Sequence, residues 1–567
     1  MTDEPNDETA SQNPYESHEA DVSSPSKDPS RSKDLSAASP RKPLVPPLWV
    51  WIVVAFTVAM IMVMRVRDVG GDHAIVNILT LILGFLAYCT LALWFLFFSG
   101  YSGMFRVGCC VAVVASVTAF FTMFRIGHVS GELIPTFRSR WAPPIDALLE
   151  TASEVGNADG VDLATTTEKD FPQWLGTHRN GTVSDLKLER DWDRHPPELL
   201  WRQPIGAGWS GFVAVNGFAL TMEQRGEEEL VTCYEIATGK LRWGHGEANR
   251  HHTILGGTGP RSTPVIHEGY VYTLGPSGSF LCLDGATGKM LWHDNILERY
   301  HVPPGEDRRA VAWGRSNSPL IVDDLVVVPV GGPEAGPRVS LAAFNRVTGE
   351  LVWEAGDRQV SFASPTLAAI GDQQMIVSVN EDTVSGHAPQ TGDVLWEIAW
   401  KGSSVGEANV SQATLLSDGR LLLSKGYSTG AALWQLSAEA NGNISATKVW
   451  DKRTVLKTKL TNHVIRQGFA YGLSDGIAEC IAIDTGKKQW KKGRYGHGQV
   501  LLVDDVLVIQ AESGEVVMVE ATPDRFHEVA KFVAIEGKTW NTPCLYGDLL
   551  LVRNAEEAAC YRLPTVD

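Results

Sequence analysis

Basic, aromatic and amide side chains recur just before short apolar stretches between residues 209 and 540. These stretches alternate apolar and polar residues with a period of two, which is typical of β-strands. If such strands surround a channel, arginine and lysine side chains that converge at its end could bind a carboxylate or an anionic polymer. We therefore predict a ligand-binding site made of Trp209, Arg261, Arg315, Lys425, Asn462, His463 and Trp540.

Each of these residues also has a structural interpretation. Arginine and lysine can neutralise strand carbonyls, and tryptophan can fill the funnel of a closed array of sheets. His463 alone is more typical of a hydrogen-bonded core histidine than of a catalytic base. The run Arg250-His251-His252 could bind a metal ion, but adjacent histidines point apart on a strand, which favours a solvated loop. We accordingly predict no catalytic residue and no metal ligand.

Several classes of site find no support in the sequence. It contains no GxxxxGK[ST] motif and no GxGxxG that follows a strand and opens a helix, so nothing predicts a nucleotide site. No CxxC pair of the kind that binds zinc occurs among the eight cysteines. The formal net charge of −17 argues against nucleic acid as a partner, because phosphates need a basic surface.

A recurring hairpin would position the candidate residues. It consists of Thr-Gly, three further residues and tryptophan, and the glycine allows the positive φ that a tight reversal needs. The motif ends at Trp243, Trp292, Trp353, Trp396 and Trp490, while Trp450 stands in a repeat that has lost Thr-Gly. We expect each tryptophan to pack between neighbouring repeats.

Eight strand-rich repeats follow one another at spacings of roughly 36 to 54 residues, the length of a four-stranded blade. They begin near Trp209, Arg261, Arg315, Ser361, Val410, Asn462, Gly498 and Trp540. The last repeat ends one strand short, whereas Glu198–Gly206 carries Trp201 in an outer-strand position before the first repeat. The predicted fold is therefore all-β: an eight-bladed β-propeller over residues 169–567 whose ring is closed by the earlier strand.

The first part of the chain predicts membrane association. Residues 1–43 are polar and proline-rich, and we expect a disordered tail. Three apolar spans, 44–64, 74–98 and 104–124, within residues 44–127, are long enough to cross a bilayer as helices, and 128–168 read as a linker. Three crossings place the tail and the propeller on opposite sides, but basic residues flank both sides equally.

The Thr-Gly-x-x-x-Trp hairpins resemble the tryptophan-docking repeats of pyrroloquinoline-quinone (PQQ) type propellers. That family includes quinoprotein alcohol dehydrogenases and the outer-membrane-protein assembly propeller. Phe171–Asp185 (FPQWLGTHRNGTVSD), Gly259–Asp284 and Val519–Phe532 look most like PQQ-like propeller proteins common in planctomycete bacteria. The resemblance covers the predicted propeller and leaves the apolar spans aside.

The resemblance implies two hypotheses of function. A quinoprotein dehydrogenase of alcohols or sugars would need PQQ, a Ca²⁺ ion held by carboxylate and amide oxygens, and an aspartate base. The family's dehydrogenases also carry adjacent cysteines, but here the adjacent pair Cys109-Cys110 lies in an apolar span. We therefore favour a non-catalytic module without cofactor that binds a protein or another ligand, anchored in the inner (cytoplasmic) membrane with its propeller in the periplasm. The PQQ- and calcium-dependent dehydrogenase remains the alternative.

Overall fold

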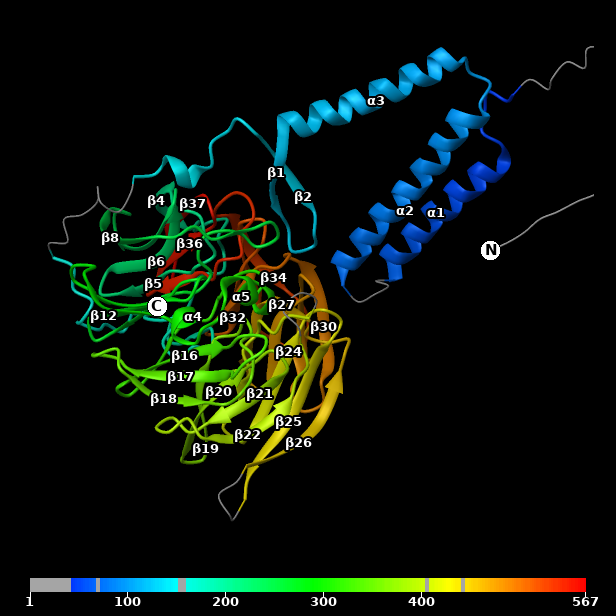
Figure 1. The fold of residues 1–567 in the computed structure, drawn as a ribbon. Helices are drawn as coiled ribbons and strands as arrows, with labels where there is room; N and C mark the ends of the chain where they lie inside the picture. The colour runs from blue at the N-terminus through cyan, green and yellow to red at the C-terminus, as the bar shows by residue number, and fades with distance from the viewer. Residues whose placement is uncertain (1–41, 68–71, 151–159, 403–406, 440–443, 567) are drawn as a thin grey trace, which may run out of the picture.

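The structure, a computed structural model, describes residues 42–67, 72–150, 160–402, 407–439 and 444–566. The predicted disordered tail lies outside the described residues, apart from residues 42 and 43. Three helices stand on one side of a large ring of β-sheets, and a hairpin lies between the helices and the ring (Figure 1).

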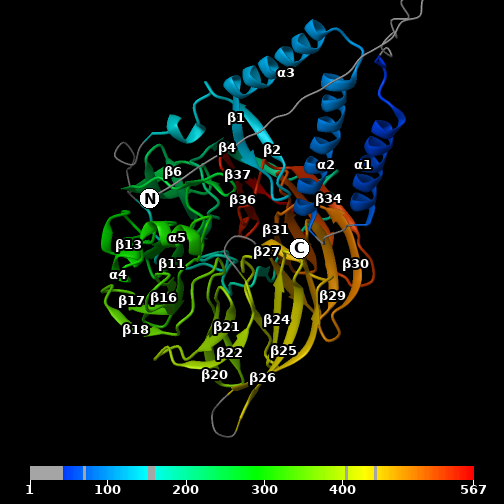
Figure 2. The ribbon, with the colours of Figure 1, turned by 45° about the vertical axis from the view of Figure 1, so that its right-hand side comes forward.

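The helices are α1 (Leu48–Arg67), α2 (His73–Leu93), which continues as the π-helical turn η1 (Trp94–Phe98), and α3 (Gly103–Met123). All three are long and apolar enough to cross a membrane, and at most 17% of any of these stretches is buried inside the protein. Helices α1 and α2 lie side by side, and α3 leads back toward the ring (Figure 2). Their apolar side chains are therefore exposed on the outside of the helices, where hydrocarbon would cover them.

The hairpin follows α3 without a break. Strands β1 (Phe124–Val129) and β2 (Pro135–Ser139) pair antiparallel, and the short 3₁₀ helix η2 (Ile145–Leu148) comes after them. Part of the segment that the sequence suggests as a linker is thus a folded two-stranded element.

Eight separate sheets form the ring, so the predicted eight-bladed β-propeller of four-stranded blades is confirmed. The first four are β5–β8 (Val213–Val215, Phe218–Arg225, Glu228–Glu235, Leu241–Ala248), β11–β14 (Val265–His267, Tyr270–Leu274, Ser279–Asp284, Met290–Asn295), β15–β18 (Leu320–Val322, Leu325–Gly331, Val339–Asn345, Leu351–Ala355) and β19–β22 (Thr366–Ile370, Gln373–Val379, Thr383–His387, Val394–Ala399). The next three are β23–β26 (Thr414–Leu415, Arg420–Lys425, Gly430–Ala438, Ile444–Lys452), β27–β30 (Thr458–Arg466, Phe469–Ser474, Ile477–Ala482, Lys487–Arg494) and β31–β34 (Gln499–Val503, Val506–Gln510, Glu515–Glu520, Glu528–Val533).

The eighth sheet closes the ring with chain from both ends of the propeller. It consists of β35 (Cys544–Tyr546), β36 (Leu549–Arg553), β37 (Glu557–Arg562) and the early strand β4 (Glu198–Pro204). Trp201 of β4 stands opposite Cys560 of β37 in the antiparallel register. The closure expected from the sequence is therefore present, and it removes the open edges that a linear array would expose.

Smaller elements connect the sheets. The two-residue strand β3 (Thr182–Val183) joins β31 in parallel as a fifth strand. A short ladder of β9 (His252–Thr253) and β10 (Gly257–Thr258) precedes β11, and the helices α4 (Ile296–Arg299) and α5 (Pro304–Ala310) separate β14 from β15.

Recurring indole groups hold neighbouring blades together. In most blades the indole N–H of the outer strand donates to a backbone carbonyl of the next blade. The pairs are Trp201 to Ile236 (2.7 Å), Trp243 to Gly285 (3.0 Å), Trp292 to Arg346 (3.1 Å), Trp353 to Pro389 (3.1 Å), Trp450 to Ile483 (2.9 Å) and Trp490 to Thr522 (2.8 Å). Trp396 instead donates to the sulfur of Met375 in its own sheet (3.2 Å), and the blade that follows it lacks the Thr-Gly turn.

The turn glycines are required for two reasons at once. Gly288 adopts φ of 71°, and a Cβ added there would lie 2.5 Å from the Trp243 ring of the preceding blade. The Thr-Gly turn therefore both reverses the chain and leaves room for the indole that packs on it.

Candidate functional site

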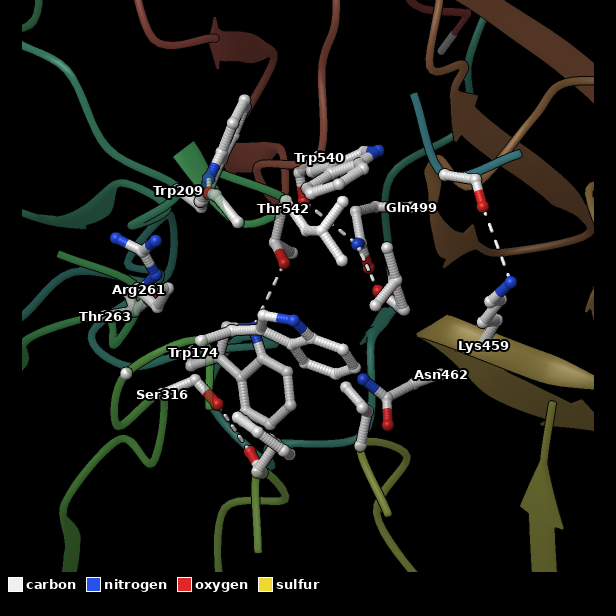
Figure 3. A pocket seen from close by; sticks show the side chains of 18 of the residues that line it. Trp174, Trp209, Arg261, Thr263, Ser316, Lys459, Asn462, Gln499, Trp540 and Thr542 are labelled. Carbon is white, nitrogen blue, oxygen red and sulfur yellow. Dashed lines mark hydrogen bonds between the residues drawn. The ribbon is translucent and has the colours of Figure 1, made fainter. Parts of the chain in front are cut away.

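A cavity of about 270 Å³ opens at the end of the central channel nearest the hairpin (Figure 3). Its walls come from residues just before the first strands of several blades, from the segment before the first blade, and from the hairpin tip. We call it the mouth cavity, and the side chains that define it include Trp174, Trp209, Arg261, Trp313, Phe362, Tyr427, Lys459, Asn462, Gln499 and Trp540.

Aromatic rings make up much of the wall. The ring centroids of Trp209 and Trp540 are 5.1 Å apart, as are those of Trp313 and Phe362. Figure 3 shows Trp209, Trp540 and Trp174 on different sides of the same space. Such rings offer a large rigid contact area for an apolar or flat group, at little cost in side-chain entropy.

The segment before the first blade contributes one of these rings. The Trp174 indole N–H donates to the Thr542 hydroxyl at 3.0 Å, which fixes the ring beside the start of the eighth blade. The same segment continues to Arg179, whose guanidinium donates to the backbone carbonyls of Pro319 (2.8 Å) and Ser318 (3.2 Å). The chain therefore crosses beneath the mouth cavity before the ring begins.

The hairpin tip forms the wall on the side of the three helices (Figure 1). Ser130, Gly131 and Leu133 line the cavity. The Gly131 N–H donates to Glu512 Oε1 at 2.7 Å, and the Lys538 ammonium donates to the Val129 carbonyl at 2.9 Å. These bonds attach the element that follows the apolar helices to the mouth of the propeller.

A lysine lies beneath the aromatic wall. Lys538 Nζ lies 3.8 Å from the centroid of Trp540 and 4.6 Å from that of Trp209, an arrangement suited to cation–π attraction. Burial lowers the pKa of Lys538 to about 7, although the Glu512 carboxylate favours its charged form. The ammonium group therefore changes charge near neutral pH.

Arg261 and Glu512 are two further charged groups around the cavity. Arg261 donates to the backbone carbonyls of Gly257 (2.8 Å) and Gly259, and burial lowers its pKa to about 9. Burial opposes ionisation of Glu512, but N–H donors from Gly131 and His497 hold its pKa below the usual value. Its Oε1 also accepts from the Trp540 indole at 3.0 Å, so this carboxylate is engaged in structural bonds.

The structure brings four of the seven predicted residues to the mouth cavity. They are Trp209, Arg261, Asn462 and Trp540. His463 lines a second cavity, together with Asn462. Arg315 and Lys425 line neither cavity.

Arg315 and Lys425 are buried and are bonded to the surrounding scaffold. The fully buried Arg315 pairs with Asp307 of α5 at 2.7 Å. Lys425 donates to the backbone carbonyls of Lys401 and Glu407, the latter at 3.2 Å, and burial lowers its pKa to about 8. Both positions match the structural interpretation, in which basic side chains neutralise oxygens of the scaffold.

His463 also has hydrogen-bond partners on both sides of its ring. Its Nε2 lies 3.0 Å from the Thr414 hydroxyl and its Nδ1 lies 3.0 Å from the Ser424 hydroxyl. Burial lowers the pKa of His463 to about 4, so the ring is neutral at physiological pH.

Several residues of the mouth cavity were not predicted from the sequence. Trp174 stands before the first repeat, and Trp313 lies two residues ahead of a predicted repeat start. The hairpin tip lies in the segment expected to be a linker. Trp174 and Trp313 could have been found from the sequence, because each is a tryptophan near the start of a repeat. By contrast, no local sequence pattern indicates that residues 130–133 reach the propeller.

The lining of the mouth cavity does not provide a calcium site. Ca²⁺ prefers several carboxylate and carbonyl oxygens, and no Asp or Glu is among the described residues that line this cavity. The Gln499 amide donates to the Leu460 and Trp540 carbonyls, at 2.8 and 3.0 Å. Across the described ranges, no cluster of three or more His, Cys, Asp or Glu has metal-binding geometry. These residues do not fit the metal that a PQQ site of the quinoprotein kind needs.

The fold and the site define a class: an eight-bladed β-propeller with an aromatic channel mouth, joined to three apolar helices. A model of the family described as outer membrane protein assembly factor BamB matches residues 227–492 and 380–541. These overlapping matches cover more than half of the chain. The chain therefore belongs to this PQQ-type propeller family.

Individual relatives are distant. The dehydrogenase subunits of quinone alcohol dehydrogenases from Gluconacetobacter polyoxogenes and Komagataeibacter europaeus are each 25% identical over 131 residues, 22% of this chain. The match spans only 16% of the length of each of these relatives.

Two solved dehydrogenase structures share the fold. A europium-containing methanol dehydrogenase is 10% identical with a TM-score of 0.53, over 70% of this chain and 99% of its own. The quinohemoprotein alcohol dehydrogenase from Comamonas testosteroni is 14% identical with a TM-score of 0.50, over 75% and 85%. BamB from Moraxella catarrhalis is 14% identical with a TM-score of 0.47, over 65% and 100%.

Proposed function

We propose that the three helices anchor this protein in a membrane and that its propeller binds a protein partner at the mouth cavity without catalysing a reaction. One observation carries this proposal: six aromatic rings line the cavity, while its described lining contains no carboxylate that could serve as a base. An aromatic surface of this kind suits an apolar segment of a protein.

Three charged groups near the cavity, Lys459, Lys538 and Glu512, are already engaged in structural bonds, and Lys538 donates to the Val129 carbonyl. Lys459 pairs with Asp72, and Glu512 accepts from Gly131 and Trp540. His497 packs against Gly131, and burial lowers its pKa. These interactions favour binding over catalysis, because a general base needs free access to its substrate.

The cell envelope is the proposed place of action, with the helices in the inner membrane and the propeller in the periplasm. The family to which the chain belongs is described as outer membrane protein assembly factor BamB, and this description supports a role in the cell envelope. Three crossings would place residue 11 and residue 193 on opposite sides. A membrane-impermeant maleimide should then label Asp193→Cys in spheroplasts and spare Ser11→Cys; the reverse pattern would place the propeller in the cytoplasm.

A photo-crosslinking amino acid tests the binding role. Leu255 lines the mouth cavity with 43% of its surface exposed, and Leu199 on outer strand β4 is 49% exposed. Benzoylphenylalanine at position 255 should form a discrete crosslink to a protein in cells, and the same group at position 199 should not. Equal crosslinking at both positions would contradict a partner site at the mouth.

The alternative function is a PQQ- and calcium-dependent alcohol or sugar dehydrogenase. The matches to two quinone alcohol dehydrogenases favour it. Addition of PQQ and Ca²⁺ to the purified full-length protein separates the two functions. Stoichiometric PQQ binding with dye reduction by alcohols or sugars would overturn the non-catalytic proposal, whereas no binding and no reduction are expected from it.

A further inference from the structure

The hairpin of β1 and β2 has two unlike faces. In its register Ile126 stands opposite Phe137, and these two side chains share one face. The neighbouring pair, Arg125 and Arg138, lies on the other face. Arg138 pairs with Glu556 of the propeller at 2.6 Å, which turns the basic face toward the ring. Since the hairpin lies between the helices and the ring, its apolar face points toward the helices (Figure 1).

The apolar face is exposed and continues the surface of α3. Ile126 is 48% exposed and Phe137 is 45% exposed. The ring centroid of Phe120, in the last turn of α3, lies 5.1 Å from that of Phe124 and 5.0 Å from that of Phe137. A two-stranded hairpin has no core of its own that could bury this face. A contiguous exposed apolar patch of this kind is typical of a surface that another molecule covers.

The base of the hairpin carries residues typical of a membrane interface. The Arg140 backbone N–H donates to the Met123 carbonyl at 2.9 Å, and its Nε–H donates to the Phe121 carbonyl at 2.9 Å. These bonds hold Arg140 at the last turn of α3, and the next residue, Trp141, is 74% exposed. Arginine and exposed tryptophan at the end of an apolar helix are typical of the level of the lipid headgroups. If α3 crosses the bilayer, the base of the hairpin therefore lies at the membrane surface.

The tip of the hairpin adjoins the start of another apolar helix. Asn77, in the second turn of α2, donates through Nδ2 to the Glu132 carbonyl at 2.8 Å. The Gly131 carbonyl accepts from Lys459, which pairs with Asp72 at the start of α2. Consecutive crossings by α2 and α3 put the start of α2 and the end of α3 at the same membrane surface. Because one end of the hairpin adjoins each of these points, the hairpin runs along that surface.

We propose that the apolar face of this hairpin is embedded in the bilayer, with Ile126 and Phe137 among the acyl chains and Arg140 at the lipid phosphates. Lipid fits this face because its apolar rings continue those of α3, and an arginine at its edge attracts the negative headgroups. The inference rests on the proposed anchoring by the three helices, and it does not require a partner at the mouth cavity. It brings that cavity next to the membrane, since Gly131 and Leu133 of the same hairpin line it.

Fluorescence quenching of the full-length protein in nanodiscs of phosphatidylethanolamine and phosphatidylglycerol tests the proposal. A fluorescent amino acid is incorporated at one position at a time, and part of the lipid carries a nitroxide near the top of its acyl chain. The fluorophore in place of Phe137 should be quenched about two- to threefold more strongly than in place of Thr136, because neighbouring residues of a strand point to opposite faces. Thr136 is the matched control, since it is an exposed residue of the same strand.

Two further positions separate this inference from the anchoring itself. Val117 of α3 is 50% exposed and should be quenched if the helix crosses the bilayer, whereas Val352 of β18 is 51% exposed and should not be quenched. Quenching at position 117 together with equal quenching at 136 and 137, strong or weak, would overturn the inference about the hairpin and leave the anchoring intact. Absence of quenching at position 117 would overturn the anchoring, and the inference with it.

Discussion

Lys459 and Asp72 are 387 residues apart in the sequence, yet the Lys459 ammonium lies 3.0 Å from Asp72 Oδ2. Asp72 caps the start of α2, where its Oδ1 accepts from the Ala74 N–H at 2.8 Å. Lys459 belongs to β27 and lines the mouth cavity. One buried ion pair thus connects a membrane-type helix directly to the mouth of the propeller.

Asp72→Asn should loosen the hairpin from the propeller mouth. The change leaves the Lys459 ammonium buried without its partner, which costs about 3 kcal/mol in comparable buried pairs. Hydrogen exchange of residues 124–139 in the full-length protein should become faster, because the same ammonium also contacts the Gly131 carbonyl at 3.4 Å.

Glu556→Gln is the control for that experiment. It breaks the Arg138–Glu556 pair, whose side chains are 39% and 41% exposed, and exposed pairs contribute about 1 kcal/mol or less. Exchange in the hairpin should change little. Equal protection of the hairpin in Asp72→Asn and in the unaltered protein would show that the ion pair does not hold it.

The indole hydrogen bonds between blades predict a difference between two similar substitutions. Replacing an indole by a smaller phenyl ring lowers the free energy of unfolding by itself. Trp353→Phe should lose about 1–2 kcal/mol beyond that loss, because it leaves the Pro389 carbonyl without its donor. Trp396→Phe removes only a bond to the sulfur of Met375 and should cost less. Urea unfolding of the two variants measures the difference, and equal losses would mean that the bonds between blades contribute nothing specific.

Two turn glycines separate backbone strain from steric clash. Gly217 has φ of 84° with nothing within 4 Å of an added Cβ, whereas Gly288 has φ of 71° and would bring its Cβ to 2.5 Å from Trp243. Gly217→Ala should lose about 1–2 kcal/mol from the left-handed backbone alone. Gly288→Ala should lose a further 1–3 kcal/mol or so, because the indole must move. Thermal unfolding of both variants checks the order, and a Gly217→Ala loss as large as that of Gly288→Ala would assign the whole effect to the backbone.

The repeat signals in the sequence predicted the ring because they are local. The reversal at Thr-Gly, the strand alternation and the returning tryptophan all lie within one blade, and even Trp201 could be assigned by its place in the repeat. Trp450 follows the same rule: it bonds to Ile483 and packs near Gly486, because the blade that follows it keeps the Thr-Gly turn.

The site was less predictable because its geometry depends on segments outside the repeat. Arg315 stands at a repeat start, but the inserted helix α5 brings Asp307 to it and buries the pair. The hairpin tip reaches Glu512 across 381 residues of sequence. Contacts between residues so far apart in the sequence depend on the closed ring and on the position of the helices beside it. No local spacing of residues predicts them.

Lys538 predicts an unusual dependence of stability on pH. Burial lowers its pKa from 10.5 to about 7 in the folded protein, so between these values the unfolded chain binds more protons than the folded one. The contribution of this lysine to stability is therefore complete above pH 10.5 and is lost as the pH falls through about 7. The free energy of unfolding should rise between pH 7 and pH 9, by up to about 1.4 kcal/mol per pH unit from this group.

Lys538→Met should lack that part of the rise. Urea unfolding of both proteins between pH 7 and pH 9 measures this difference, and groups that do not interact with Lys538 cancel from it. Parallel profiles would mean that the ammonium keeps its charge beside Trp540 across this range.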